Sequence, residues 1–258
     1  MLDAMWRRRS GDWHQRALLI GAVTAAIFSA HCGDAGQGNG DPPSEDLALC
    51  HAPTSVGGAP QTIEDVTALI NALANEHGGT VELPCFVASL TRPLGAATSS
   101  GFISAQPAEG KRSPRMFLWS GALVMSVVPE GIGANLLELG FETTPTRSIK
   151  AEIEFPVTAP LSRSAPYDRI LGEPLSKCAA CHANEEPVTS VTWAKALESE
   201  VLRPSRFDEV DLGSVDQESK ACNKAAEPQR CALLGAVFDQ GGIHARAFAP
   251  EARTLYGD

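Results

Sequence analysis

Aromatic and basic residues are both scarce in this sequence. Phe, Trp and Tyr make up 6% of the 258 residues, and 21 Lys and Arg stand against 31 Asp and Glu, which gives a formal net charge of −10. A surface with this charge repels a phosphate backbone, and few rings are available to stack on bases. The composition therefore excludes nucleic acid as an expected partner.

Long apolar runs and the common catalytic motifs are also absent from the sequence. The apolar run at residues 17–30 has 14 residues, which is shorter than the roughly 20 that a membrane-spanning helix needs. G-x-S-x-G, Walker and H-E-x-x-H patterns do not occur, so nothing indicates a serine hydrolase, a P-loop nucleotide site or a zinc protease. We expect a binding or electron-transfer protein rather than an enzyme.

Residues 1–32 have the layout of a secretory signal. Four arginines precede the apolar run 17–30, and a polar, glycine-rich segment follows it. The segment around Cys32 resembles the lipobox of bacterial lipoproteins, in which the cysteine carries the lipid. His31 departs from that pattern, because a small residue is usual there, so ordinary signal cleavage near Ala35 is the competing interpretation. Both interpretations predict export to the cell envelope or periplasm, and the first adds a lipid anchor in a membrane.

The rest of the chain divides into three regions by composition and periodicity. Residues 33–61 are rich in Gly, Pro, Asp and Ser, which predicts a flexible linker. Residues 62–165 are predicted to form a β-rich domain with a leading helix, and residues 166–258 a small, mostly α-helical domain. The expected fold class is α+β, with an antiparallel β-sandwich-type domain followed by the helical one.

Individual elements follow from the same patterns. Thr62 and Asp65 form a capping box that predicts a helix, and the glycines at 78 and 79 end it. Strands are expected at 80–90, 116–129, 134–143 and 148–157. In the last of these the apolar side chains face inward, and the charged ones face outward: Lys150, Glu152 and Glu154. Further helices are expected at 190–203, from a capping box at Ser214 to Cys222, and from Pro228 to Phe238.

Four of the seven cysteines are candidates for disulfides. Cys50, Cys85, Cys222 and Cys231 are an even number in an oxidising compartment, which permits two bridges. Four cysteines allow three pairings. A Cys222–Cys231 bridge is preferred, because it would hold the last two predicted helices together across their short turn.

The stretch Cys178-Ala-Ala-Cys181-His182 carries the most specific chemistry in the chain. This segment resembles the haem-attachment motif of c-type cytochromes, and the resemblance covers these five residues. It implies that Cys178 and Cys181 form thioethers to one haem c and that His182 is the proximal iron ligand. The helical region 166–258 would then be a cytochrome c-like domain.

The sixth iron ligand stays open at this point. No methionine follows Cys178, and His244 is the only histidine downstream of the motif. His244 is therefore a candidate sixth ligand. The other two interpretations are an open or water-filled position and a methionine, Met116 or Met125, that reaches across from the β-rich region.

Interpretations without haem also fit the motif. Cys178 and Cys181 could form a redox-active or structural disulfide, or bind zinc together with Cys222 and Cys231, or have no cofactor at all. We expect an envelope protein with one haem c, for one-electron transfer with a redox partner protein that the sequence does not identify, or for haem-based binding. The alternative is a cofactor-free, disulfide-stabilised lipoprotein whose β domain binds a partner or a glycan.

Overall fold

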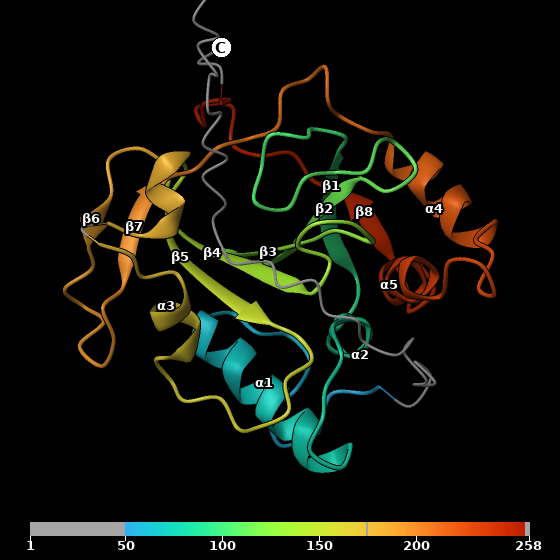
Figure 1. The fold of residues 1–258 in the computed structure, drawn as a ribbon, viewed down its shortest axis with the longest axis horizontal. Helices are drawn as coiled ribbons and strands as arrows, with labels where there is room; N and C mark the ends of the chain where they lie inside the picture. Colours follow the sequence, from blue (N-terminus) through green and yellow to red (C-terminus); the bar gives the residue numbers. More distant parts are fainter. Residues whose placement is uncertain (1–49, 174, 256–258) are drawn as a thin grey trace, which may run out of the picture.

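The computed structural model describes residues 50–173 and 175–255. The predicted signal segment and Cys32 lie outside the described residues, as does most of the predicted linker. The strands form an eight-stranded, mixed and mostly antiparallel sheet in the order β6-β7-β5-β4-β3-β2-β1-β8, and several short helices accompany it (Figure 1). The predicted α+β class is confirmed.

The centre of the sheet is an antiparallel meander of five consecutive strands. The strands are β1 (Leu94–Ser99), β2 (Arg115–Ser120), β3 (Leu123–Val127), β4 (Leu136–Thr144) and β5 (Arg147–Glu154). β2 and β3 are joined by a tight turn at Gly121, whose φ of 62° favours glycine. Three of the four predicted strand segments therefore lie in this meander.

The prediction of a β-sandwich and a separate helical domain is wrong. The described strands belong to one sheet, and the C-terminal part of the chain completes both of its ends. β6 (Glu186–Pro187) and β7 (Leu197–Glu200) extend it beyond β5, and β8 (Ile243–Ala245) pairs in parallel with β1. The pattern of each segment indicated its type but not this non-local pairing.

Helix α1 (Ile63–Glu76) has the predicted capping box. Thr62 Oγ1 accepts from the Asp65 amide at 3.1 Å, and the Asp65 carboxylate accepts from the Thr62 amide at 3.0 Å. The strand predicted at 80–90 is wrong, because Leu83–Ala88 form the short helix α2. Pro84 lies in the first turn of α2, where a missing amide hydrogen costs nothing. Phe86 in this helix is fully buried.

The C-terminal helices are α4 (Leu212–Lys220) and α5 (Pro228–Phe238), which follow the short α3 (Ala165–Arg169). Asp211 rather than Ser214 is the N-cap of α4, and its carboxylate accepts from the Ser214 amide at 2.8 Å. The Cys222–Cys231 disulfide joins the end of α4 to α5 as predicted, and Cys50 pairs with Cys85. The helix predicted at 190–203 is wrong, because β7 occupies its second half.

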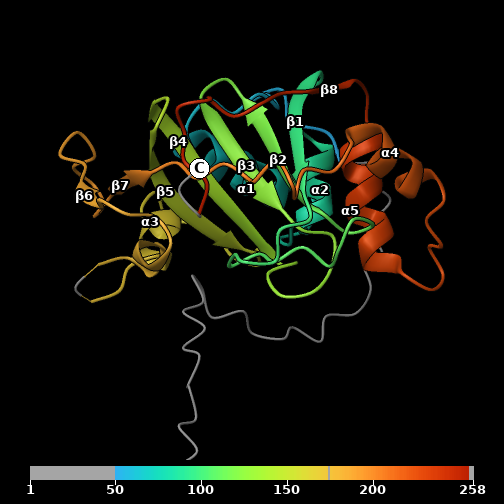
Figure 2. The same cartoon turned by 90° about the horizontal axis from the view of Figure 1, so that it is seen from above.

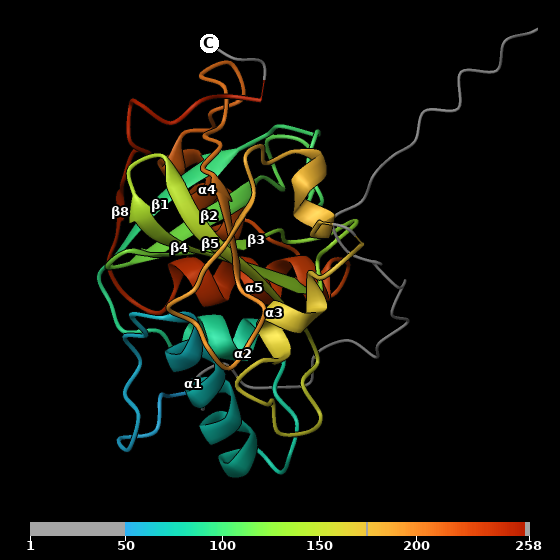
Figure 3. The same ribbon diagram turned by 90° about the vertical axis from the view of Figure 1, so that its left-hand side faces the viewer.

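The two faces of the sheet have different environments. One face packs against α1, α2 and α3, and its apolar side chains form the core. Long loops and the 3₁₀ helix η2 (Lys177–Ala180) lie on the opposite side, as Figure 3 shows. Seen from above, β6 and β7 lie at one end of the molecule, and α4 and α5 lie at the other (Figure 2). Among the described residues, no helix is long and apolar enough to span a membrane.

Candidate functional site

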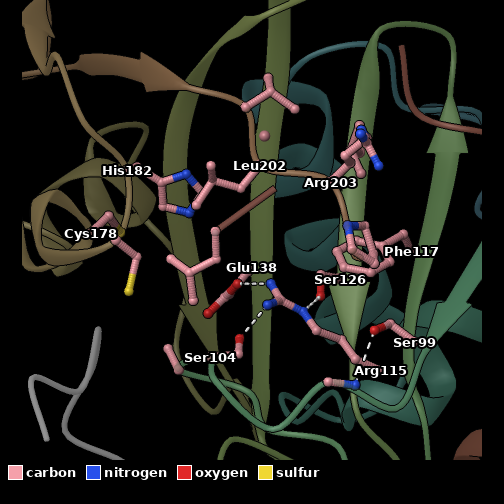
Figure 4. A pocket seen from close by; sticks show the side chains of 18 of the residues that line it. Ser99, Ser104, Arg115, Phe117, Ser126, Glu138, Cys178, His182, Leu202 and Arg203 are labelled. Carbon is pink, nitrogen blue, oxygen red and sulfur yellow. Dashed lines mark hydrogen bonds and ion pairs between the residues drawn. The ribbon is translucent and has the colours of Figure 1, made fainter. Parts of the chain in front are cut away.

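A cavity of about 380 Å³ lies over the polar face of the sheet. Its floor consists of side chains that alternate with the core residues along β2 to β5, and its walls come from the loops before β2, after η2 and after β7 (Figure 4). This volume falls within the range of small-molecule and cofactor sites. The cavity contains all three residues of the predicted haem motif: Cys178, Cys181 and His182.

The two motif cysteines are held at the cavity by a capped 3₁₀ turn. Ser176 Oγ accepts from the Cys178 amide at 3.1 Å, and the Ser176 amide donates to the Glu185 carboxylate at 2.7 Å. Residues three apart in a 3₁₀ helix lie above one another, so Cys178 and Cys181 reach the same space. Both keep their thiols outside the two disulfides.

His182 is fixed in one tautomer. Its Nδ1 lies 2.8 Å from the Glu200 carbonyl oxygen, and because a carbonyl can only accept, Nδ1 carries the hydrogen. Burial, together with the nearby charges of Lys150 and Arg115, lowers the pKa of His182 to about 3, although the hydrogen bond to the Glu200 carbonyl opposes the shift. The imidazole is therefore neutral, and Nε2 is left with a lone pair. This is the arrangement of a metal-binding histidine, whose second nitrogen usually donates to a carbonyl or carboxylate.

The far part of the floor is a hydrogen-bonded cluster around Arg115. Its guanidinium pairs with Glu138 and with Ser104, and its Nε donates to Ser126 Oγ at 2.6 Å. Figure 4 shows this cluster across the cavity from the His182 ring and the Cys178 side chain.

The near part of the floor is formed by β5, the strand whose charged side chains were predicted to face outward. Lys150 and Glu152 point away from the core, but both are buried because they face the cavity. Lys150 Nζ donates to Ser148 Oγ at 2.7 Å, and Arg169 Nε donates to the Glu152 carboxylate at 2.6 Å. Burial raises the pKa of the Glu152 carboxyl to about 7; Arg169 opposes the rise and the charge of Glu138 adds to it.

The mouth of the cavity is apolar and exposed. Phe102 and Phe207 come from two different loops and are 73% and 77% exposed, and two more exposed apolar residues, Ile103 and Leu255, also line the cavity. Exposed apolar groups gathered at one opening are unusual on a protein surface and indicate a binding site. Phe248 forms part of the wall and packs edge-on against Phe117 with ring centroids 5.0 Å apart.

The other predicted site residues lie away from this cavity. His244 is exposed on β8, at the opposite edge of the sheet from η2, and it is not among the cavity residues. Met116 and Met125 are fully buried in the core on the other face of the sheet. The zinc interpretation is wrong in its four-cysteine form, because Cys222 and Cys231 are joined in a disulfide.

Sequence reasoning missed the residues that form the floor and the mouth. The charged positions of β5 were visible as an alternating pattern, but a pattern of this kind does not distinguish a solvated face from a face that lines a cavity. Phe102 carried no signal, since it lies in a loop without periodicity. No family model, no curated protein and no solved structure matches this chain.

Proposed function

We propose that this chain is an exported haem c protein in which Cys178, Cys181 and His182 hold one haem. The observation that carries the proposal is that these three side chains line one cavity, with both sulfur atoms present as thiols and with a neutral, tautomer-fixed imidazole. A chance occurrence of the five-residue motif would have no reason to lie at a cavity of cofactor size.

The residues around the motif fit such a group. Both thiols can add to vinyl groups of a single porphyrin, and Nε2 of His182 is the nitrogen available to iron. The apolar mouth would cover a flat macrocycle, since Phe102 and Phe207 stand on two separate loops at its opening. When bound, the haem would supply one-electron redox chemistry or an iron centre for ligands.

The proposed role is one-electron transfer or haem-based binding at the cell envelope. Two disulfides among the described residues agree with an oxidising compartment. In this proposal Cys32 carries a lipid anchor, and residues 33–61 link it to the folded part, so that the haem protein stays at the membrane and meets a redox partner protein there.

The test is to produce the chain in the periplasm of a host with haem-maturation factors. We expect an intact mass increased by one haem, a band that stains for haem after denaturing electrophoresis, and a Soret peak. Cys178→Ser with Cys181→Ser removes the covalent haem. Cys222→Ser with Cys231→Ser is the matched control, because it removes two sulfur atoms elsewhere and leaves attachment intact. Colourless folded protein from this host would refute the proposal.

A cofactor-free binding protein is the second candidate, and the floor of the cavity favours it. The Arg115–Glu138 and Arg169–Glu152 pairs place four charged groups at or beside the cavity. A flat apolar ligand alone does not require these charges. Such a floor would suit a small polar ligand such as a sugar. Colourless protein that binds a glycan in calorimetry, and loses that binding with Glu138→Gln, would support this second candidate.

A further inference from the structure

Residues 176–185, which contain the haem motif, form a loop whose two ends are joined by side-chain hydrogen bonds. One oxygen of the Glu185 carboxylate accepts from the Ser176 amide at 2.7 Å, and the other oxygen accepts from the Ser176 hydroxyl. Ser176 is only 6% exposed. Hydrogen bonds to an ionised carboxylate are stronger than those between neutral groups, so this pair is a firm closure of the loop.

Glu185 also sets the direction of the Ser176 hydroxyl. A carboxylate can only accept, so the hydroxyl hydrogen points to Glu185 and the lone pairs of the oxygen face other donors. The Cys178 amide donates to this oxygen at 3.1 Å. That bond caps η2, the turn that carries the motif cysteines. Glu185 thus acts on the motif through Ser176.

Both ends of the loop are also tied to the rest of the fold. The Lys177 amide donates to the Ile170 carbonyl at the end of α3, at 2.9 Å. The chain reverses at Asn184, whose φ of 56° lies in the left-handed region that asparagine adopts more readily than most residues. Arg147 of β5 donates to the Asn184 carbonyl at 3.0 Å, and this bond ties the reversal to the sheet. The loop is therefore anchored by contacts within the protein.

We infer that Glu185 is a positioning residue that holds the motif turn in place before haem arrives, so that the folded, haem-free protein is competent to attach haem. This inference rests on the proposed haem c function. In the attachment step each thiol adds its S–H bond across one vinyl group: a C–S bond forms, the hydrogen goes to the other vinyl carbon, and no oxidant or reductant is consumed. A turn that is already formed avoids the entropy cost of ordering it during this step.

The first test uses haem-free protein from the periplasm of a host without maturation factors, kept in a mild reductant, and amide hydrogen exchange followed by NMR. Glu185→Gln keeps the shape of the side chain but offers one acceptor oxygen in place of two, so one of the two Ser176 donors loses its partner. We expect the Ser176 and Cys178 amides to exchange about 10-fold faster or more, the value of one charge-assisted hydrogen bond. Glu186→Gln is the matched control, because its side chain is 69% exposed and its ion pair with Arg147 is long, at 3.7 Å.

The second test adds ferrous haem to the same folded proteins under reducing conditions and separates uptake from attachment. The Soret peak follows uptake, and the pyridine haemochrome spectrum with the intact mass follows thioether formation. We expect Glu185→Gln to form thioethers about 10-fold more slowly than the wild type or Glu186→Gln. Uptake is expected to stay within about 2-fold, because His182 is held separately by the Glu200 carbonyl. A general loss of structure would lower both.

Ser176→Ala tests the same pair from the other side. It removes the hydroxyl that links Glu185 to the Cys178 amide. Because the two residues act as one unit, the double variant with Glu185→Gln is expected to form thioethers no more than about 2-fold more slowly than the slower single variant. Additive losses would overturn the link through Ser176. Ser176→Ala also serves if Glu185→Gln does not accumulate.

The two proposals fail in different ways. If Glu185→Gln attaches haem as fast as the wild type, with equally protected amides, the role of Glu185 is overturned and the haem proposal stands. Equal loss of uptake and of thioether formation overturns that role as well. Wild-type protein that carries haem from a host with maturation factors but does not attach it once folded overturns the inference alone. Protein that stays without haem in both experiments overturns both.

Discussion

Glu138 on β4 and Glu152 on β5 are direct cross-strand partners, and both carboxylates face the cavity over the polar face of the sheet. Like charges in this position destabilise a sheet. Here each carboxylate has its own arginine: Arg115 pairs with Glu138, and Arg169 pairs with Glu152 from the α3 side. The pair is thus a cost in stability that the fold offsets locally, as is common at binding sites.

Glu152→Gln is expected to change the pH dependence of stability. The carboxyl has a pKa of about 7 in the folded protein and about 4.3 when unfolded. Its contribution to the free energy of unfolding is therefore fully present below pH 4.3 and is lost as the pH rises through 7. Glutamine abolishes this loss. The stability of the variant relative to the wild type is therefore expected to increase between pH 4.5 and pH 8, by a few kcal/mol at most. Urea unfolding at both pH values measures the gain.

The control for this prediction is Glu154→Gln on the same strand. Glu154 also pairs with Arg169, at 2.8 Å, but its side chain is 38% exposed. Its replacement is expected to leave the shape of the pH profile unchanged. An identical gain in both variants would show that the effect comes from Arg169 and not from the buried carboxyl.

His182 is expected to make the haem-free protein sensitive to acid. Its pKa is about 3 in the folded state and about 6.5 unfolded, so the unfolded state binds a proton first as the pH falls. Stability is therefore lost between about pH 6.5 and pH 3, with a total on the order of a few kcal/mol. His182→Asn removes this part of the acid transition, which circular dichroism follows. His244→Asn, at an exposed position, should behave like the wild type.

The two disulfides are expected to contribute unequally. Cys50–Cys85 closes a separation of 35 residues and Cys222–Cys231 one of 9. From loop-closure entropy, we expect replacement by serine to lower the free energy of unfolding by about 4 kcal/mol for Cys50–Cys85 and by about 2.5 kcal/mol for Cys222–Cys231. Equilibrium urea unfolding measures both. A larger loss from the shorter loop would mean that packing of α4 on α5, rather than loop entropy, dominates that bridge.

The apolar mouth is expected to affect the reduction potential of the proposed haem but not the stability of the fold. Phe102→Ser with Phe207→Ser should change stability by no more than about 0.5 kcal/mol per site, because both rings are exposed. In the loaded protein the same change admits water, which favours the ferric state and lowers the reduction potential by an amount on the order of tens of millivolts. Spectroelectrochemistry measures the potential. Val56→Ser, an exposed apolar residue outside the cavity, is the control.

Local patterns accounted for a definite part of the structure. The capping box at Thr62, the alternation in β5 and the proline at the start of α5 each depend on neighbours within a few residues, so the sequence alone predicts these elements. The Cys222–Cys231 bridge belongs to the same group, because its two cysteines are only nine residues apart. The motif at 178–182 was likewise evident without coordinates.

Some segments have a pattern that fits both a helix and a strand, and tertiary contacts determine which of the two forms. Residues 80–90 alternate like a strand, yet α2 forms there because side chains on every side of it are buried in the core. Leu197 and Val201 fit one stripe of a helix, but they also fit one face of a strand, and pairing with β5 selects the strand. Tertiary contacts outweigh propensity in such short segments.

The sequence by itself determined the chemistry available: two thiols and an imidazole in one turn, four further cysteines for bridges, and a strand with one charged side. Only the tertiary structure decided that loops cover this charged side. It also placed Lys150 and Gly140 at the same cavity as His182, and it placed His244 outside that cavity. The reason is physical. Alternation records which side chains avoid the core, but what covers them depends on contacts between residues far apart in the chain.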